Sequence, residues 1–387
     1  MNTICNSKIR EIFSPVYYRV WDKGYEFTLC LVKKIIDRTS ITERLTGNLV
    51  SIRELISKLN FVDESFVTLE WLLNFAVDGG LLVRENNDTN TYYSISEHCD
   101  TSKFYKNEEL IEREILAMDP TWKVFVELTK LIAGDYALFL RGEKRGLDIL
   151  FARDRINYWN DYFCNKFNGY TAFNLLGAQS VISILNDHTN SKILEIGAGT
   201  GGATEKLVFL LKAVSLIKKI EAYVFSDISP IFLRYGNRIL TSIIGDEFFY
   251  DTRKLDFNFP LTEQNIDKES YDIIYGVNAL HVSKNLLNSV KYIYEVLKPG
   301  GSLVVCEYVR PVNGFPLYME IIFSMLDSYT NVATEEACRS TYGFLTISNW
   351  YRVFNTAGFN KIESIDDSLG VDNFKRDKMA MVMRGIK

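Results

Sequence analysis

The stretch KILEIGAGTGGAT occupies residues 192–204 and decides the fold of the chain's second half. Its apolar run, 193–196, predicts a buried strand of a parallel sheet. Glycines follow at once, and because they carry no Cβ they let the backbone turn sharply and approach a ligand. Leu207, Leu210 and Leu211 then recur at the spacing of one helix face. The stretch therefore predicts a strand, a ligand-binding turn and an amphipathic helix.

Two cofactors fit a turn of this kind. Gly197, Gly199 and Gly202 match the dinucleotide pattern G-x-G-x-x-G, which alone is a weak signal for NAD(P). Glu195 lies at the strand end, two residues before the first glycine, and an acid there favours S-adenosylmethionine. We expect Glu195 to orient the turn and to face the cationic end of that ligand.

Two further strand ends also favour S-adenosylmethionine. Asp227 follows the strand predicted at 222–226, where a carboxylate can accept both ribose hydroxyls, a role that NAD sites share. Asp256 and Phe257 end a strand predicted at 254–257, and we expect them to hold adenine by its amino group and its face. The sequence therefore predicts S-adenosylmethionine as the cofactor and S-adenosylhomocysteine as its product.

Strands and helices alternate from residue 190 onward, which predicts a doubly wound α/β fold with a mainly parallel sheet. The predicted strands are 192–196, 221–226, 254–257, 271–277 and 302–306, with an antiparallel edge pair at 360–365 and 379–384. Ligands bind beyond the carboxyl ends of the strands in such sheets. The predicted cofactor-binding residues are Glu195, Gly197, Gly199, Gly201, Asp227, Asp256, Phe257 and Asn278.

His281 and Glu307 are the candidate catalytic pair. His281 follows the strand predicted at 271–277, and imidazole is the side chain best suited to remove a proton from a methyl acceptor near neutral pH. Glu307 follows the strand predicted at 302–306, which places its carboxylate on the same rim. A carboxylate bonded to one ring nitrogen fixes the tautomer and raises the basicity of the other nitrogen. A structural histidine, or a pairing of Glu307 with Arg310, is the alternative.

Resemblance to known families points the same way. The loop at residues 195–199 reads E-x-G-x-G and resembles that of class I S-adenosylmethionine-dependent methyltransferases. Three further segments are similar to the C-methyltransferase domains of polyketide synthases: residues 227–233, 278–286 and 297–307. The resemblance implies a Rossmann-like methyltransferase sheet in which His281 and Glu307 match the catalytic dyad of those domains. It leaves open whether the acceptor is carried by a carrier protein.

The first third of the chain predicts a winged helix. Ser51 and Glu54 form a capping box that opens one helix, and a second helix spans 63–77. The segments 81–84 and 91–95 then flank a polar turn, as in a hairpin. A DNA-binding regulator has to be considered, but residues 61–80 contain four acidic residues and no lysine or arginine. A phosphate-facing helix needs cations, so we expect no nucleic-acid partner.

This arrangement resembles the N-terminal domain of small-molecule O-methyltransferases, where a winged helix serves dimerisation and roofs the substrate pocket. The resemblance implies a homodimer, with an apolar helix at 16–36 as interface or lid. Connecting helices are predicted at 108–130 and 136–151, with breaks at 134–135 and 141–146. We place the domain boundary at residue 140, which gives a helical domain at 1–140 and a methyltransferase domain at 141–387.

Two aromatic-rich segments are candidate walls of an acceptor pocket. One spans residues 155–173, and the other is an insertion at 308–345 whose apolar spacing predicts an amphipathic helix. The residues assigned to the pocket are Tyr158, Trp159, Tyr162, Phe315, Met319 and Phe323. Aromatic walls suit a mostly apolar acceptor, although the same residues also suit an ordinary core.

Bulk composition limits the partners, the location and the metal content that we expect. A net charge of −5 argues against nucleic acid or anionic membrane held by bulk electrostatics. The six cysteines are scattered without a C-x-x-C pair, and no apolar leader or membrane-length run is present, so a cytoplasmic location is expected. We expect no metal site, since no His/Cys cluster is evident.

Together these features predict a methyltransferase of specialised metabolism that acts on a carbon or oxygen of a small acceptor, with His281 as general base. N-methylation of a small heterocycle and a non-catalytic S-adenosylmethionine-binding module are the alternatives.

Overall fold

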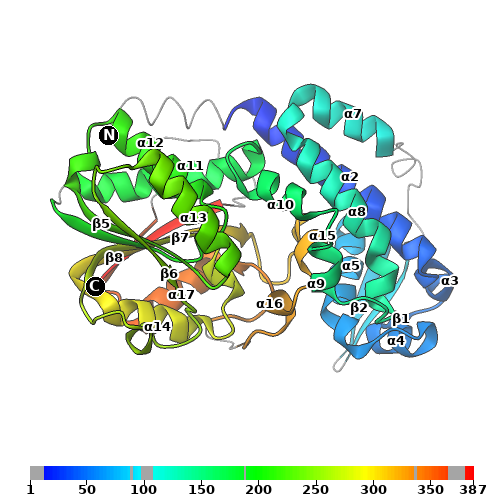
Figure 1. The fold of residues 1–387 in the computed structure, drawn as a ribbon. Coiled ribbons are helices and arrows are strands. Elements are labelled where there is room, and N and C mark those ends of the chain that lie inside the picture. The colour runs from blue at the N-terminus through cyan, green and yellow to red at the C-terminus, as the bar shows by residue number, and fades with distance from the viewer. Residues whose placement is uncertain (1–12, 88–89, 97–107, 187–188, 335–337, 365–379) are drawn as a thin grey trace. The chain divides into compact units, whose positions relative to one another are not determined.

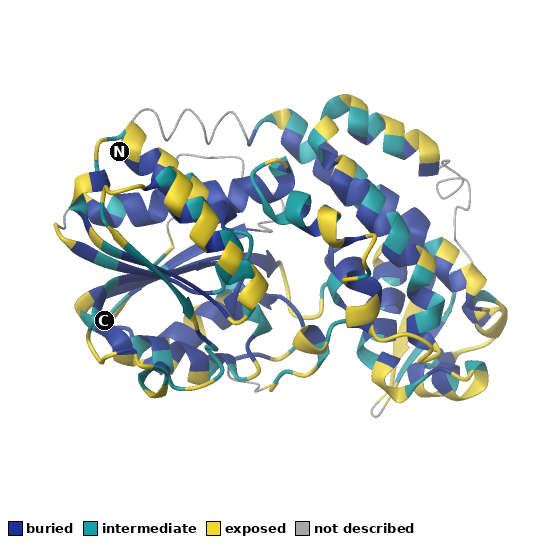
Figure 2. Cartoon of the chain, in the orientation of Figure 1, coloured by how far each residue is buried: buried dark blue, intermediate teal, exposed yellow. Residues whose placement is uncertain are grey.

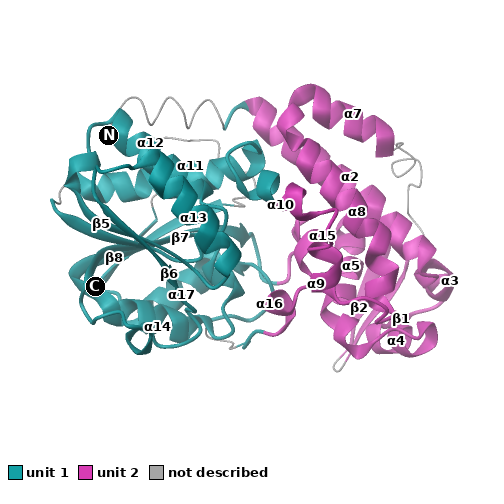
Figure 3. Cartoon of the chain, viewed as in Figure 1, with its two compact units in different colours: residues 1–14, 160–313, 332–387 teal, residues 15–159, 314–331 magenta. Residues whose placement is uncertain are grey.

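The computed structural model describes residues 13–87, 90–96, 108–186, 189–334, 338–364 and 380–387. The chain divides into two units, shown in Figure 3. We call residues 160–313 and 332–387 the sheet unit, and residues 15–159 and 314–331 the helical unit. The helical unit therefore includes a segment that lies late in the sequence.

The sheet unit is built on a mainly parallel sheet. Among the described residues the strand order is β10-β11-β8-β7-β4-β5-β6, with β9 paired to β8. The strands are β4 Ser191–Glu195, β5 Ile220–Asp227, β6 Phe249–Lys254, β7 Tyr271–Val277, β8 Leu297–Arg310, β9 Leu345–Thr346, β10 Lys361–Ser364 and β11 Ala380–Ile386. Parallel pairs join β6 through β8, and β11 is antiparallel to both β8 and β10. The predicted doubly wound sheet and its antiparallel edge pair are confirmed.

Helices cover both faces of this sheet, as Figure 1 shows. The helices α11 Asn168–Leu185, α12 Gly202–Ala213 and α13 Pro230–Ile243 lie on one face, and α14 Leu286–Val296 and α17 Ile347–Ala357 lie on the other. The core beneath α14 and α17 includes Leu194, Ile274, Val305, Ile293 and Trp350, all fully buried. Figure 2 shows that the central strands are dark blue along most of their length. Burial on both faces explains why these strands read as continuous apolar runs.

The helical unit contains the predicted winged helix. Its helices are α4 Ile52–Leu59 and α5 Phe66–Asp78, and its small sheet has the order β1-β3-β2, with β1 Val50–Ser51, β2 Leu82–Asn86 and β3 Thr91–Ile95. The Ser51–Glu54 capping box is present at the start of α4. The remaining helices are α2 Pro15–Arg38, α3 Ile41–Leu45, α7 Glu108–Met118, α8 Lys123–Leu140, α9 Gly146–Leu150 and α10 Ile156–Phe163, whose last residues belong to the sheet unit.

The insertion segment 314–331 is hydrogen-bonded into the helical unit. Thr68 Oγ1 donates to the Ser324 carbonyl at 2.7 Å, and Trp71 Nε1 donates to the Leu317 carbonyl at 3.1 Å. The Tyr136 hydroxyl donates to the Ile321 carbonyl at 3.0 Å. Three buried side chains from α5 and α8 thus hold the main chain of a segment that is remote in sequence.

Three predicted elements are wrong. Residues 254–257 are not a strand, because β6 ends at Lys254 and the Asp256 carboxylate accepts a hydrogen bond from the Asn258 N–H, which starts a turn. The amphipathic helix expected within 308–345 is replaced by shorter elements: β8 continues to Arg310, and among the described residues of this stretch only α15 Glu320–Phe323 and α16 Asp327–Thr330 are helical.

The third error is a misplaced break between helices. Helix α8 continues through Gly134 and Asp135, where a break was predicted. A side chain at Gly134 would meet nothing within 4 Å, so packing does not require a glycine here. The residue lies inside a continuous helix at a small cost in helix propensity. The break instead falls at Asp119 and Pro120, where the Asp119 carboxylate accepts a hydrogen bond from the Thr121 N–H and proline supplies no N–H of its own.

Candidate active site

The glycine turn after β4 has the backbone that its sequence predicts. Gly197, Gly199 and Gly201 have φ of +61°, +54° and +79°, in the left-handed region that favours glycine. A Cβ on Gly197 would lie 2.6 Å from the Ala279 Cβ and 3.8 Å from the Phe257 ring, so the loops after β4, β6 and β7 meet here. A Cβ on Gly199 would have only the Gly197 carbonyl within 4 Å. Gly199 therefore borders open space.

Asp227, at the end of β5, holds the glycine turn. Its Oδ2 accepts a hydrogen bond from the Gly199 N–H at 3.0 Å, and its Oδ1 accepts one from the Ser229 N–H at 2.8 Å. Burial raises the pKa of the Asp227 carboxyl. Each carboxylate oxygen has a second lone pair, so the expected contact with two ribose hydroxyls is compatible with these bonds. That contact stays a prediction.

The loop after β6 is tied to the loop after β7. Asp256 Oδ1 accepts hydrogen bonds from both the main-chain N–H and the side-chain amide of Asn258, at 2.9 and 2.8 Å. Asn258 Oδ1 in turn accepts one from the Lys284 N–H at 2.8 Å. Phe257 packs against the core from a partly exposed position. The predicted adenine-binding residues thus share one hydrogen-bonded framework with the loop that carries His281.

Glu195 occupies a different place from the one expected. Its side chain is in the interior, where the hydroxyls of Thr204 and Tyr223 donate hydrogen bonds to Oε2. The Tyr223 and Tyr275 hydroxyls are hydrogen-bonded to each other at 2.6 Å. Burial raises the pKa of Glu195 to about 7. The strand's alternation sends Glu195 under α12 while Ile196 enters the opposite core. Glu195 therefore anchors the first turn of α12 and does not face an open ligand site.

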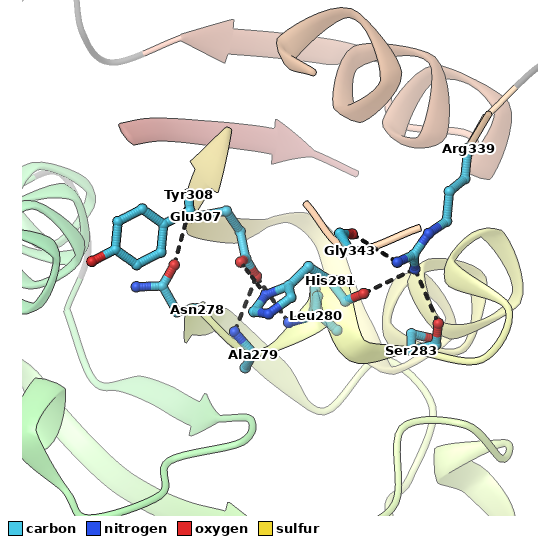
Figure 4. A network of polar contacts seen from close by, with 9 residues as sticks. All are labelled: Asn278, Ala279, Leu280, His281, Ser283, Glu307, Tyr308, Arg339 and Gly343. Carbon is cyan, nitrogen blue, oxygen red and sulfur yellow. Dashed lines mark hydrogen bonds and ion pairs between the residues drawn. The ribbon is translucent and has the colours of Figure 1, made fainter. Parts of the chain in front are cut away.

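His281 and Glu307 form the pair that the sequence predicted (Figure 4). His281 Nδ1 lies 2.7 Å from Glu307 Oε2, and Glu307 Oε1 accepts hydrogen bonds from the N–H groups of Ala279 and Leu280 at 3.1 and 2.8 Å. The Glu307 side chain is fully buried, whereas the His281 side chain is 13% exposed. Arg310, the alternative partner, donates to the carbonyls of Tyr342 and Phe344.

This geometry defines the chemistry that His281 can perform. A carboxylate accepts the Nδ1–H hydrogen bond, which leaves the lone pair of the neutral ring on Nε2. The exposed fraction of the pair belongs to His281, so its ring is the part that a ligand can reach. A general base oriented by a buried carboxylate has this arrangement, and that role for His281 stays a prediction.

Asn278 fixes the start of the loop that leads to His281. It adopts a left-handed conformation with φ +48°, and its Oδ1 accepts a hydrogen bond from the Tyr308 N–H at 2.9 Å (Figure 4). Its own N–H donates to the Cys306 carbonyl at 2.8 Å. Asn278 thus ties β7 to β8 at the rim, and its predicted contact with a cofactor stays a prediction.

Sequence reasoning missed two residues that contact His281. Arg339 is 2% exposed and donates to the His281 carbonyl at 2.8 Å, and the Phe344 ring centroid lies 4.5 Å from that of His281. Both residues come from an irregular segment with no periodicity or motif. Nothing in the sequence could place that segment beside His281.

The predicted pocket residues are divided between the two units. Trp159 and Met319 are buried in the helical unit, and the Trp159 indole donates to the Leu150 carbonyl at 2.6 Å. Tyr162 is buried in the sheet unit against the rings of Phe163 and Phe167. Tyr158, Phe315 and Phe323 are partly exposed. Their role in an acceptor pocket stays a prediction.

The described residues contain neither a metal-binding cluster nor a membrane-spanning helix. No group of three or more histidine, cysteine, aspartate or glutamate side chains there is arranged to hold a metal ion. No helix in the same residues has the length and apolarity needed to cross a membrane.

The chain is similar to known proteins over part of its length. Residues 194–303 match the family model described as "Methyltransferase domain". The polyketide synthase ThaQ from Burkholderia thailandensis is 25% identical over 256 residues, which cover 65% of this chain and 12% of that protein. The highly reducing polyketide synthase NEC1 from Pyricularia oryzae is 30% identical over 179 residues, which cover 46% of this chain and 6% of that protein. The chain thus matches only a small part of these relatives.

Solved structures show the same fold over nearly the whole chain. The CurJ carbon methyltransferase has a TM-score of 0.79 at 17% identity and covers 98% of this chain and 96% of its own. The CMeT domain of the citrinin polyketide synthase has a TM-score of 0.75 at 16% identity and covers 99% and 94%. Residues 194–303 therefore match a methyltransferase domain, and the chain shares its fold with these carbon methyltransferase structures.

Proposed function

We propose that this protein methylates the carbon between the two carbonyl groups of a β-dicarbonyl acceptor, such as a β-ketoacyl thioester. The observation that carries the proposal is the His281–Glu307 pair, with its 2.7 Å contact, beside the glycine turn. The similarity to carbon methyltransferase domains supports carbon over oxygen as the methylated atom. The similarity to polyketide synthases supports an acceptor bound to a carrier protein.

Residues around the glycine turn would hold S-adenosylmethionine, which supplies an electrophilic methyl group when bound. The open space beside Gly199 is the room that a ligand needs, since any side chain there would project into it. Asp227 borders this space through its hydrogen bond to the Gly199 N–H. Phe257 lies near Gly197 from the loop after β6, which fits its predicted contact with adenine.

His281 would remove the acceptor's proton through Nε2. The carbon between two carbonyls is acidic enough for imidazole to deprotonate it, and a base whose pKa lies near the working pH is the most effective. Once protonated, the ring carries a positive charge next to the Glu307 carboxylate, which stabilises it. The two main-chain N–H groups on Oε1 keep that carboxylate in place.

The test is methyl transfer to a β-ketoacyl pantetheine thioester, followed by NMR to locate the new methyl group. His281→Ala should lower turnover by roughly 10²–10⁴-fold while calorimetry shows unchanged affinity for S-adenosylhomocysteine. His188→Ala is the matched control, because His188 lies in the polar sequence stretch 186–190 and belongs to none of the predicted sites, so this variant should keep full turnover. Full turnover in His281→Ala, or methylation of oxygen, would contradict the proposal.

A further inference from the structure

Arg339 is a buried cation that donates hydrogen bonds to main-chain carbonyl groups around His281. Its Nη1 donates to the carbonyl of His281 at 2.8 Å and to that of Ser283 at 3.3 Å. Its Nη2 donates to the Gly343 carbonyl at 2.8 Å (Figure 4). One planar guanidinium therefore links the loop that carries His281 to the segment that follows Arg339.

That segment also covers the His281 ring. The Phe344 ring centroid lies 4.5 Å from that of His281, at an interplanar angle of 37°. Phe344 is itself held by its carbonyl, which accepts a hydrogen bond from the buried Arg310 at 2.6 Å. Two arginines thus hold the segment 339–344 through its main-chain carbonyls, Arg310 at Phe344 and Arg339 at Gly343.

His281 is consequently held at three points. Glu307 holds Nδ1, Arg339 holds the main-chain carbonyl, and Phe344 packs against the ring. The direction of Nε2 depends on the backbone of the short helical turn at 280–282 as well as on the side-chain contact. A base misplaced by about 1 Å can cost roughly 10² in rate.

We propose that Arg339 is a positioning residue for His281, a role that rests on the proposed function. It acts through the main chain and does not touch the reacting atoms. Lysine can carry the same charge but has a compact ammonium group, which cannot reproduce the planar fork of the guanidinium. Arg339→Lys should therefore keep the charge and lose part of the positioning.

The test is a double-mutant cycle between Arg339 and His281, measured by transfer of labelled methyl to a β-ketoacyl pantetheine thioester. Arg339→Gln should lower kcat by about 10² in the wild-type background, and Arg339→Lys by about tenfold. In the His281→Ala background, Arg339→Gln should lower the residual rate by less than about twofold, because the group it positions is gone. Affinity for S-adenosylhomocysteine should stay within about twofold of wild type in every variant.

Arg384→Lys is the matched control. Arg384 belongs to the same unit and donates to Ser302 Oγ at 3.0 Å, away from His281 in β11, so kcat should stay within about twofold. If Arg339→Gln does not fold, Arg339→Lys carries the test in both backgrounds.

The outcomes separate the two proposals. If Arg339→Gln lowered the rate by the same factor in the wild-type and His281→Ala backgrounds, the positioning role alone would be overturned. Wild-type kcat in Arg339→Lys would overturn it as well. Full turnover in His281→Ala would overturn the proposed function, and the positioning role with it.

Discussion

Glu307 is a buried carboxylate that holds both the loop after β7 and the imidazole of the proposed base. Its two oxygens receive hydrogen bonds from the His281 ring and from the N–H groups of Ala279 and Leu280. A buried carboxylate without partners would be costly, so these three donors are what makes its burial tolerable. The same contacts fix the loop that carries His281.

Glu307→Gln should separate the charge from the shape of this site. The amide keeps one acceptor oxygen but cannot accept from both sides, and it gives no charge stabilisation to a protonated ring. We expect kcat for methyl transfer to fall by about 10² with unchanged affinity for S-adenosylhomocysteine. Asp272→Asn is the control, because Asp272 accepts hydrogen bonds from Lys192 and Lys298 elsewhere in the same sheet unit. If Glu307→Gln and Asp272→Asn lowered kcat equally, the role of the Glu307 charge in orienting and stabilising His281 would be contradicted.

Glu195 should make stability depend on pH. Burial raises the pKa of its carboxyl from 4.5 to about 7 in the folded chain, so the folded state retains this proton over a range in which the unfolded state has lost it. The resulting stabilisation is complete below pH 4.5 and is lost as the pH rises through 7, by ~3 kcal/mol in all.

Glu195→Gln should remove this component, because the amide does not titrate. Urea unfolding at a series of pH values measures it as the difference between the wild-type and variant free energies of unfolding. That difference should change across pH 4.5–7. A constant difference across the range would show that Glu195 titrates normally.

For single residues, the sequence predicts the position of a side chain well when the end of a strand determines that position. His281 follows β7 and Glu307 lies near the end of the neighbouring parallel strand β8, so their meeting could be predicted from the sequence. Glu195 was assigned to the ligand because the glycine motif suggested it, whereas strand alternation placed it under α12. Arg339 could not be found, because it reaches the His281 loop through main-chain carbonyl groups, which no sequence pattern marks.

Among the elements, the glycine turn between β4 and α12 is subject to two separate constraints, one on backbone conformation and one on packing. Both Gly197 and Gly199 have positive φ, so alanine at either position costs about 1–3 kcal/mol in backbone strain. Only Gly197 is also packed, against the Ala279 side chain. Gly199 faces open space.

Alanine at these two positions should therefore fail in different ways. Gly197→Ala should lower the melting temperature more than Gly199→Ala does, because of the clash with Ala279. Gly199→Ala should stay folded but lose S-adenosylhomocysteine affinity by at least about tenfold, since its methyl group enters the ligand's space. Thermal unfolding and calorimetry measure the two effects. Wild-type affinity in Gly199→Ala would place the ligand elsewhere.

Element prediction succeeded where burial sets a clear pattern. The strand predicted at 271–277 matches β7 at both ends, because a strand buried on both faces is a continuous apolar run. The strand predicted at 254–257 was misplaced, because β6 spans Phe249–Lys254. Its partly exposed position at the sheet edge gives a weaker sequence pattern, and Asp256 starts a turn. The helix break lies at Pro120, whereas α8 continues through Gly134.

For the whole molecule, the chain crosses between its two units more than once. The segment 314–331 leaves the sheet unit after β8 and is hydrogen-bonded within the helical unit. Thr68 and Ser324 are 256 residues apart, so no local pattern in the sequence could predict this contact. The boundary at residue 140 and the homodimer stay predictions.

Removing one of these contacts should loosen the segment 314–331 locally. Thr68→Val keeps the shape of the side chain but deletes the hydrogen bond to the Ser324 carbonyl, which is worth about 1 kcal/mol. Hydrogen exchange of amides in that segment should therefore rise by roughly 5–10-fold.

Thr129→Val is the matched control, because Thr129 is equally buried but bonds only within α8, to the Phe125 carbonyl. It should leave exchange in the segment 314–331 at the wild-type rate. Equal rises in the two variants would mean that the segment is not held by Thr68.

Exchange of the acceptor's own proton tests the central claim most directly, because it observes the base without methyl transfer. The acceptor would be a β-ketoacyl pantetheine thioester in D₂O, with S-adenosylhomocysteine bound to the protein and deuterium uptake followed by NMR. The account predicts that wild type accelerates exchange at the carbon between the carbonyls and that His281→Ala reduces this to the uncatalysed rate. Undiminished exchange in His281→Ala would show that another group takes the proton.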